Sequence, residues 1–283
     1  MSDGIRIAVA QSPVTCDPLA NGAAVRELMV AAREAGARLV HFPEGAISGY
    51  PSGAEAKQAL AGWFIDWAAV QNQLELTTKA AADLGLWVVV GSSHRLTPPN
   101  RPHNSMYVIS DGGQLRGRYD KRRCSHTEIT GWYSPGFTPF TFDIDGFRFG
   151  SALCIEVTFP ELFIEYRELG VDCVLLSSFS EDPVFGVLAR GHAAAHTYWV
   201  SVSVPAQCSA AMPAGVIGPH GSWLARCPAD GTAALACVDL DRADPNLDIA
   251  LNKARPWRES ARAGQIYEDR RVADSRSTDR TRF

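Results

Sequence analysis

The chain has 283 residues, of which 46% are hydrophobic and 20% are charged; this size and apolar content fit one large α/β domain or two modest ones, and they exclude a small disulfide-stapled module and wholesale disorder. The formal net charge is −4. That mild acidity argues against a dedicated nucleic-acid-binding protein, which usually carries a surplus of basic residues.

Apolar segments with strand character alternate along the chain with segments of helical spacing. Strands are predicted, in chain order, at 5–11, 38–42, 86–92, 103–110, 114–119, 140–144, 147–153, 171–177, 198–204, 216–218, 222–226 and 233–240. Helices are predicted at 20–34, 54–84, 159–169 and 187–197. Asp111-Gly112-Gly113 and Asp145-Gly146 predict hairpin turns, so the sheets are expected to be mixed. This alternation predicts an α/β architecture in which helices cover the faces of one sheet or two.

The seven cysteines are odd in number and form no CxxC pair, unlike a secreted disulfide framework or a zinc ribbon. The first residues, MSDGIRIAVAQ, lack the basic and apolar regions of a signal peptide. The apolar runs, such as 86–90 and 171–176, are too short to span a bilayer. We therefore expect a reduced, cytoplasmic enzyme without membrane contact, in which one cysteine can serve catalysis and the others fill the core.

The segment 253–283 differs from the body of the chain in charge. It carries a local charge of +4, whereas the preceding residues carry −8. Its last part, DRRVADSRSTDRTRF, is polar and poor in apolar residues. We therefore predict one domain over 1–252 and an extension over 253–283 that is partly disordered or lies on another subunit. The acids interspersed in this segment argue against nucleic-acid binding.

Cys154 is the candidate nucleophile. It ends the apolar run 147–153 and comes shortly before a predicted helix. At such a position, backbone N–H groups and the helix dipole can stabilise a thiolate. The competing interpretation is an unreactive cysteine at the end of a buried strand.

Three charged residues follow other predicted strands. Glu44 comes directly after the strand 38–42, where a carboxylate with a raised pKa can act as a general base or, alternatively, a loop glutamate can cap a helix. Lys121 follows the strand 114–119 and can stabilise developing negative charge, unless it belongs to a solvated basic cluster. Glu128, seven residues later, can orient Lys121 or be an ordinary loop acid. Together with the cysteine, these residues supply the parts of an activated-nucleophile hydrolase.

With these motifs in order, the sequence resembles the nitrilase, or carbon–nitrogen hydrolase, superfamily from about residue 5 to about residue 267. The family's glutamate, lysine and cysteine motifs match HFPEG with Glu44, GRYDKRR with Lys121 and SALCIEVTFPEL with Cys154. Glu128 matches a second glutamate that many members carry near the lysine. The later segments AGVIGPHGSWLA and ARPWRESARAGQIY also resemble parts of many members.

The sequence departs from the family pattern at two places. Ile155, Glu156 and Thr158 stand where many members have Tyr, Asp and Arg. Ala195-His196 stands where a Glu-Asn pair is usual.

The resemblance implies a four-layer αββα sandwich and a homodimer or higher homo-oligomer. It also implies a cysteine-dependent hydrolase of non-peptide carbon–nitrogen bonds that uses no metal or other cofactor. In this scheme Cys154 attacks a small-molecule amide or N-carbamoyl carbonyl and forms a thioester, while Glu44 moves the protons. Lys121, held by Glu128, stabilises the oxyanion together with the N–H of Ile155.

The expected pocket-lining residues are Trp132, Tyr50 and Phe179, because they lie near the motifs in sequence. Two alternatives stay open for the function: a nitrilase that uses the same residues on a nitrile, and an inactive member that serves as a binding or assembly subunit. His192 and His196 share a helix face, as zinc ligands can, but they lack the HExxH glutamate and an obvious third ligand, which favours a packed or interfacial role. We find no P-loop and no strand-associated GxGxxG that would indicate a nucleotide cofactor.

Overall fold

The computed structural model describes residues 4–51, 65–281 and 283, and its centre is a pair of six-stranded sheets. The first sheet has the order β12-β1-β2-β3-β4-β5, and the second has the order β11-β10-β9-β8-β7-β6. The strands of the first sheet are β1 (Gly4–Gln11), β2 (Leu39–His41), β3 (Trp87–His94), β4 (His103–Ile109), β5 (Leu115–Asp120) and β12 (Ala234–Asp241). Those of the second sheet are β6 (Thr141–Ile144), β7 (Phe147–Leu153), β8 (Cys173–Ser177), β9 (Trp199–Ser203), β10 (Gly215–Ile217) and β11 (Trp223–Arg226).

Both sheets are mixed, as the hairpin signals predicted. The neighbours β1-β2-β3 and β7-β8-β9 run parallel. The remaining pairs, including the hairpins β4-β5 and β6-β7, run antiparallel.

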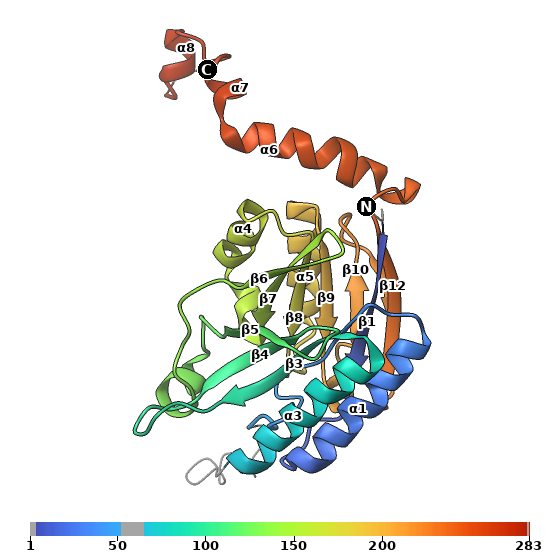
Figure 1. Cartoon of the computed structure of the whole chain (residues 1–283). Helices are drawn as coiled ribbons and strands as arrows, with labels where there is room; N and C mark the ends of the chain where they lie inside the picture. The colour runs from blue at the N-terminus through green and yellow to red at the C-terminus, as the bar shows by residue number, and fades with distance from the viewer. Residues whose placement is uncertain (1–3, 52–64, 282) are drawn as a thin grey trace.

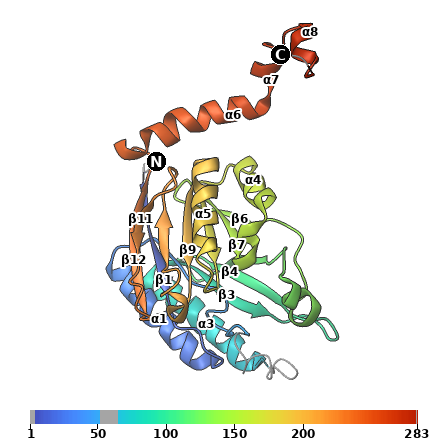
Figure 2. The same cartoon turned by 180° about the vertical axis from the view of Figure 1, so that it is seen from behind.

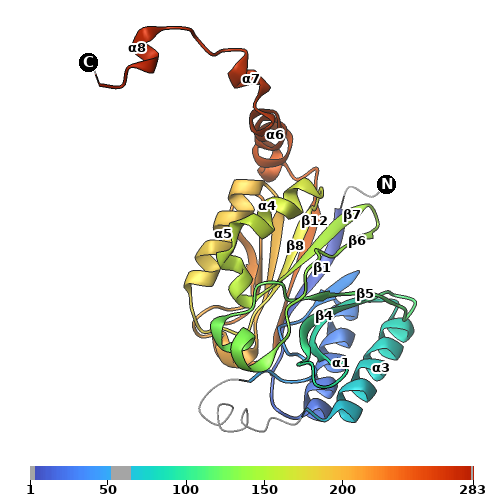
Figure 3. The ribbon, with the colours of Figure 1, turned by 90° about the vertical axis from the view of Figure 1, so that its left-hand side faces the viewer.

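Helices cover the outer face of each sheet (Figures 1 and 3). The first sheet carries α1 (Pro18–Glu34) and α3 (Trp67–Leu84), and the second carries α4 (Pro160–Glu168) and α5 (Val184–His196). This confirms the four-layer αββα sandwich. Residues 54–64 of the predicted helix 54–84 lie outside the described residues, and residues 67–84 of it form α3. Within the described ranges, no helix is both long and apolar enough to cross a membrane.

The alternation of side chains along β1 explains why its residues 7–10 are all apolar. Ile7 and Val9 belong to a core cluster that joins the two sheets. Ala8 and Ala10 belong to the cluster beneath α1 and α3. Because successive side chains of a strand point to opposite faces, a strand buried on both faces must be apolar at every position.

Short helical turns connect several of these elements. They are η1 (Glu128–Trp132), η2 (Cys154–Thr158), η3 (Ala206–Cys208), η4 (Pro245–Leu247) and η5 (Ile249–Ala254). η1 and η5 are π-helical, whereas η2, η3 and η4 are 3₁₀ turns. Both η1 and η2 carry residues of the candidate site.

The C-terminal segment contains short helices. It forms α6 (Arg255–Ala263), α7 (Gln265–Glu268) and α8 (Ser275–Thr278), and it extends away from the sandwich (Figures 1 and 2). Arg255, Arg258 and Arg262 donate hydrogen bonds to backbone carbonyls at the C-terminal end of α5. Because the last carbonyls of a helix lack partners within it, these arginines attach α6 to the body. The boundary at residue 252 falls within η5 and stays a prediction.

Candidate active site

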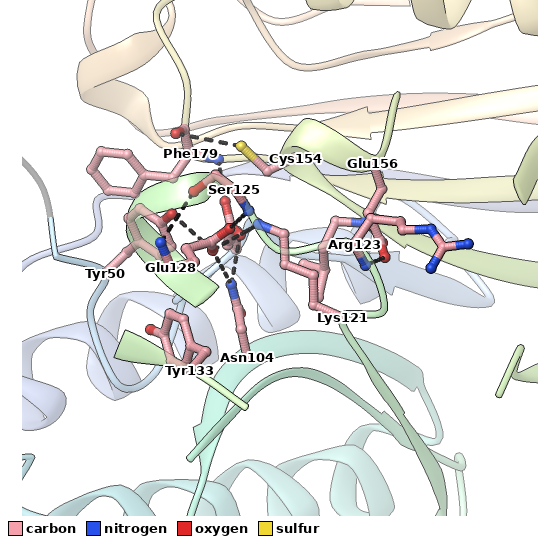
Figure 4. A network of polar contacts seen from close by, with 12 residues as sticks. Tyr50, Asn104, Lys121, Arg123, Ser125, Glu128, Tyr133, Cys154, Glu156 and Phe179 are labelled. Carbon is pink, nitrogen blue, oxygen red and sulfur yellow. Dashed lines mark hydrogen bonds and ion pairs between the residues drawn. The ribbon is translucent and has the colours of Figure 1, made fainter. Parts of the chain in front are cut away.

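Four of the predicted site residues, Glu44, Lys121, Glu128 and Cys154, meet where strands of the two sheets end, and Figure 4 labels the last three of them. Glu44 follows β2, Lys121 follows β5, Glu128 opens η1 and Cys154 opens η2 directly after β7. Their side chains are almost completely buried; that of Lys121 is 1% exposed and that of Glu44 is 0% exposed. This burial excludes the solvated basic cluster as an account of Lys121.

The ammonium of Lys121 is shared by two carboxylates. Its Nζ donates to Glu44 Oε1 over 3.0 Å and to Glu128 Oε1 over 2.8 Å. Asn104 reinforces this arrangement, because its Nδ2 donates to the same two oxygens over 2.7 and 3.3 Å. Oε2 of Glu128 accepts a further hydrogen bond from Ser125 N at 2.7 Å. The cation and both acids are therefore held in fixed positions.

Asn104 was not among the residues that the sequence singled out. It reaches the site because β4 and β5 pair with Ser105 opposite Asp120, and the next pair in this register is Asn104 with Lys121. The backbone N–H of Lys121 donates to the Asn104 carbonyl over 2.8 Å. The sequence predicted the hairpin but not its register, and it is the register that places Asn104 opposite Lys121.

The two carboxylates have pKa values that move apart. Burial raises the pKa of Glu44, and the charge of Lys121 only partly opposes it. Burial also acts to raise the pKa of Glu128, but the charge of Lys121 and the hydrogen bonds to this carboxylate outweigh it, so the pKa is lowered. Burial opposes the charge of Lys121, yet the surrounding negative groups raise its pKa. Glu128 is thus the permanent partner of the ammonium, and Glu44 is the group suited to exchange a proton.

Cys154 occupies a sharp turn between β7 and η2. Its backbone φ is +52°, a conformation that costs a non-glycine residue on the order of 1–3 kcal/mol. Burial raises the pKa of its thiol to about 12, with a further contribution from Glu44 that Lys121 opposes. The thiolate that the sequence suggested is therefore disfavoured. The cost of desolvating the charged sulfur outweighs any stabilisation that the N-terminus of the five-residue η2 offers. Ile155, the next residue, is partly buried.

Phe179 contacts both the acid and the thiol through its backbone. Its N–H donates to Glu44 Oε2 over 2.8 Å. Its carbonyl oxygen lies 3.8 Å from Sγ of Cys154, within hydrogen-bond reach of a thiol. The segment that follows β8 therefore sets the distance between the side chains of Glu44 and Cys154.

Glu156 fastens the cysteine turn to the lysine segment. Its fully buried carboxylate accepts backbone N–H hydrogen bonds from Leu153 (2.7 Å), Arg122 (2.7 Å) and Arg123 (2.9 Å). The hydroxyl of Tyr119 donates to it over 2.8 Å. The sequence marked this position only as a departure from the family pattern, so this bracing role was missed. The sequence signal that could have indicated this role is an acidic residue two positions after Cys154.

Aromatic side chains form one wall of the site. The ring of Tyr50 stacks on Phe179 at 5.2 Å between centroids and meets Trp132 edge-on at 6.1 Å. Tyr133, which the sequence did not single out, stacks on Tyr50 at 6.5 Å. The hydroxyl of Tyr50 donates to Glu128 Oε1 over 3.0 Å. The three expected pocket-lining residues thus lie together, and Tyr50 connects this wall to the charged cluster.

The histidine pair has packing partners instead of a ligand geometry. His192 Nε2 lies 2.9 Å from the carbonyl oxygen of Val157 in η2, and its ring stacks on Phe163 at 3.8 Å. Burial lowers the pKa of His196 to about 4. Across the described part of the chain, no group of three or more His, Cys, Asp or Glu side chains is arranged to hold a metal ion.

Comparisons with known proteins place this geometry in context. The sequence model described as carbon–nitrogen hydrolase matches residues 6–245. A hydrolase from Mycobacterium tuberculosis is 26% identical over 264 residues, which cover 84% of this chain and 90% of that protein. An arylacetonitrilase from Aspergillus kawachii is 32% identical over 142 residues, which cover 46% of this chain and 41% of that protein.

Solved structures share the fold. The crystal structure of an amidase from Nesterenkonia superposes with a TM-score of 0.74 at 23% identity, covering 90% of this chain and 95% of that one. One mutant of that amidase shows covalent addition of the acetamide moiety of fluoroacetamide at its active-site cysteine. Another mutant is in complex with butyramide.

Proposed function

Because the chain belongs to the carbon–nitrogen hydrolase family, we propose that it hydrolyses small-molecule amides or N-carbamoyl compounds through a thioester on Cys154. One observation carries this proposal. A protonated thiol, a carboxylate with a raised pKa and a fixed ammonium share one buried site. The butyramide complex of the Nesterenkonia amidase and the covalent adduct on its active-site cysteine support amide chemistry at a nucleophilic cysteine for this chain.

The first step is attack on the substrate carbonyl by Cys154. Because the pKa of its thiol is raised to about 12, the nucleophile must lose its proton during the attack instead of waiting as a thiolate. Glu44 accepts this proton, since its own pKa is raised towards the working range of a general base. The sulfur–carbon bond forms as the carbonyl electrons move onto the oxygen.

Lys121 and the N–H of Ile155 stabilise the resulting oxyanion. Before attack, Lys121 faces the charges of Glu44 and Glu128; afterwards Glu44 is neutral and the negative charge is on the oxyanion. The net charge of the buried site is therefore unchanged, so the ammonium stabilises the new charge without reorganisation. A preorganised donor of this kind contributes on the order of 3–4 kcal/mol.

The remaining steps return the enzyme to its starting state. Glu44 delivers its proton to the leaving nitrogen, the carbon–nitrogen bond breaks, and ammonia or an amine departs from the thioester. Glu44 then accepts a proton from water as the water attacks the thioester. The acid is released and Cys154 regains its proton.

A cavity of about 370 Å³ adjoins the aromatic wall and favours substrates that carry a carboxylate. Trp132, Arg95 and Arg101 are among its lining residues. Arg101 donates to the Ile129 carbonyl over 3.1 Å, and neither arginine forms an ion pair within the described residues. The guanidinium of Arg95 lies over the ring of Trp67. Two guanidinium groups at one cavity attract an anion, as an N-carbamoyl amino acid would supply.

The same proposal includes a homodimer in which the C-terminal extension contacts the second copy. The extension leaves the sandwich, and Trp257, Tyr267 and Val272 on it are large apolar side chains exposed to solvent. Apolar side chains gathered on a projecting segment indicate a protein contact. Light scattering should show a dimer for the full chain and a monomer for a chain that ends at Ala263; a dimer for both chains would remove this part of the proposal.

An ammonia-release assay tests the activity. The panel contains simple amides, N-carbamoyl amino acids with free or amidated carboxylates, and nitriles matched to the amides. The proposal predicts turnover of amides or carbamoyl compounds, preference for the free carboxylate, and no activity in Cys154→Ala. Faster turnover of the matched nitriles would favour the nitrilase alternative. The absence both of turnover and of any acyl adduct on Cys154 would favour a binding or assembly subunit.

A further inference from the structure

His41 is a buried titratable residue that the proposed reaction does not use. It lies in β2, three residues before Glu44, and is completely buried. Its Nε2 lies 2.9 Å from Ser177 Oγ on β8, and its Nδ1 lies 3.0 Å from Ser201 Oγ on β9. Since β2 belongs to one sheet and β8 and β9 to the other, this imidazole forms a polar bridge through the interior of the sandwich.

The direction of each hydrogen bond in this bridge follows from the proton count. Ser177 Oγ donates its one proton to the Phe42 carbonyl over 2.7 Å. Nε2 of His41 must therefore carry a proton and donate to Ser177 Oγ. Burial lowers the pKa of His41 to about 3, so the ring is neutral and Nδ1 accepts from Ser201. One ordered chain of hydrogen bonds thus runs from Ser201 through His41 and Ser177 to Phe42.

This chain ends on the two segments that hold the reacting groups. Phe42 lies two residues before Glu44, and Ser177 lies two residues before Phe179. Phe179 in turn contacts Glu44 Oε2 at 2.8 Å and Cys154 Sγ at 3.8 Å. A shift between the ends of β2 and β8 would therefore alter the separation of the acid and the thiol.

We propose that His41 is a positioning residue that fixes Glu44 relative to Cys154 by orienting the Ser177 hydroxyl. The inference rests on the proposed function, because it assigns His41 to that same reaction. A purely structural bridge is the competing explanation. The two explanations differ in what happens to turnover when an equal amount of folding stability is lost by removing a side-chain hydrogen bond that does not end on β2 or β8.

The chain offers a matched control for that comparison. Ser203 is buried on β9, like Ser201, and its Oγ donates to the Ala10 carbonyl of β1 in the opposite sheet. It makes the same kind of contact across the same interior, but β1 carries no residue of the site. The backbone of Ser203 pairs with Ser177 and accepts the Ser178 N–H, and Ser203→Ala keeps that backbone pairing while removing only the side-chain hydrogen bond to β1.

Two substitutions of His41 separate its two nitrogens. In His41→Gln the side-chain amide lies near the position of Nε2 and can still donate to Ser177. In His41→Asn the amide lies near Nδ1, so the donation to Ser177 is lost. Retention of kcat by His41→Gln but not by His41→Asn, at equal melting temperatures of the two variants, is a result that loss of packing alone does not produce.

The experiment compares kcat, KM and the pH profile of kcat/KM for Ser177→Ala, His41→Asn, His41→Gln and Ser203→Ala, with thermal melting of each. Ser177→Ala and His41→Asn should lower kcat by roughly 10- to 100-fold with little change in KM, as small misplacements of reacting groups do. The acid limb of their kcat/KM profile should move to higher pH, since Glu44 loses alignment with the Phe179 N–H. His41→Gln should retain more activity, and Ser203→Ala should keep the wild-type kcat and limb despite its lower melting temperature.

Two outcomes would overturn the inference while the hydrolase proposal stands. In one, Ser203→Ala loses as much kcat as Ser177→Ala; in the other, Ser177→Ala and His41→Asn keep the wild-type kcat and acid limb. If the wild-type chain hydrolyses nothing in the substrate panel, the proposed function fails separately. The positioning role is then measured by alkylation of Cys154 with iodoacetamide, in which the sulfur–carbon bond forms, iodide leaves and Glu44 accepts the thiol proton. Peptide mapping should give the same order of rates among the variants, and equal rates would overturn it.

Discussion

The backbone N–H of Phe179 donates to Oε2 of Glu44 over 2.8 Å, so the proposed base is held by a residue from the opposite sheet. The carbonyl of Phe179 lies 3.8 Å from the Cys154 sulfur. One peptide segment therefore fixes both partners of the proton transfer. This explains how residues so far apart in sequence can act at a single carbon atom, and it makes the catalytic geometry sensitive to how the sheets are joined.

Replacing Glu44 by glutamine should lower kcat by roughly 10²- to 10⁴-fold, the usual contribution of a positioned general base. The amide cannot accept the thiol proton, and its NH₂ group must face a donor, either Lys121 Nζ or the Phe179 N–H. Steady-state kinetics with an amide substrate measure the effect, and a melting curve confirms folding. A folded Glu44→Gln protein with kcat within a few-fold of wild type would rule out this role.

The pH profile of kcat/KM should show an acid limb whose midpoint lies above the ordinary glutamate value of 4.5. Burial raises the pKa of Glu44, and only its ionised form can accept the thiol proton, so activity falls as the pH falls through that raised value. Glu128, whose pKa is lowered, stays ionised over this range. A limb at or below pH 4.5 would contradict the assignment of Glu44 as the base.

Glu156→Gln should destabilise the fold by about 1–3 kcal/mol. The carboxylate accepts hydrogen bonds from several backbone N–H groups, and the amide NH₂ of glutamine would face one of these donors without being able to accept from it. The matched control is Glu161→Gln, which removes the ion pair to Arg123 between side chains that are 56% and 50% exposed. Such an exposed pair contributes only about 0–1 kcal/mol. Urea unfolding measures both variants. Equal, small losses would show that Glu156 does not brace the site.

The stability of the wild-type protein relative to His41→Gln should fall as the pH drops below about 6.5, the ordinary value for histidine. In the folded state burial lowers the pKa of His41 to about 3, so between these values the unfolded chain binds a proton that the folded chain does not. The difference in unfolding free energy should change by about 1.4 kcal/mol per pH unit in this window. Urea unfolding at several pH values should reveal this slope. A pH-independent difference would show that His41 is not buried in neutral form.

The sequence supplied much of the site because each of its motifs ends a strand. Glu44, Lys121 and Cys154 follow β2, β5 and β7. Strand pairing orders the strands within each sheet, and the packing of the two sheets against each other brings these ends together. Asn104 escaped notice, since its place opposite Lys121 depends on the strand register. The burial of Lys121 was equally hidden, because its neighbours Arg122 and Arg123 suggested an exposed basic cluster.

The C-terminal helices show a different kind of gap. α6 has no buried residue, so hydrophobic periodicity gave no signal for it. It is attached instead by arginines that bind the free carbonyls at the end of α5. Such tertiary capping needs the positions of both helices, which composition and spacing do not contain.

Peptide-mapped mass spectrometry of the chain during amide turnover is the most direct test of the account. It predicts a mass increase equal to the acyl group of the substrate on the peptide that contains Cys154, and neither adduct nor turnover in Cys154→Ala. Product formation at the wild-type rate by Cys154→Ala, with no adduct at this position, would contradict it.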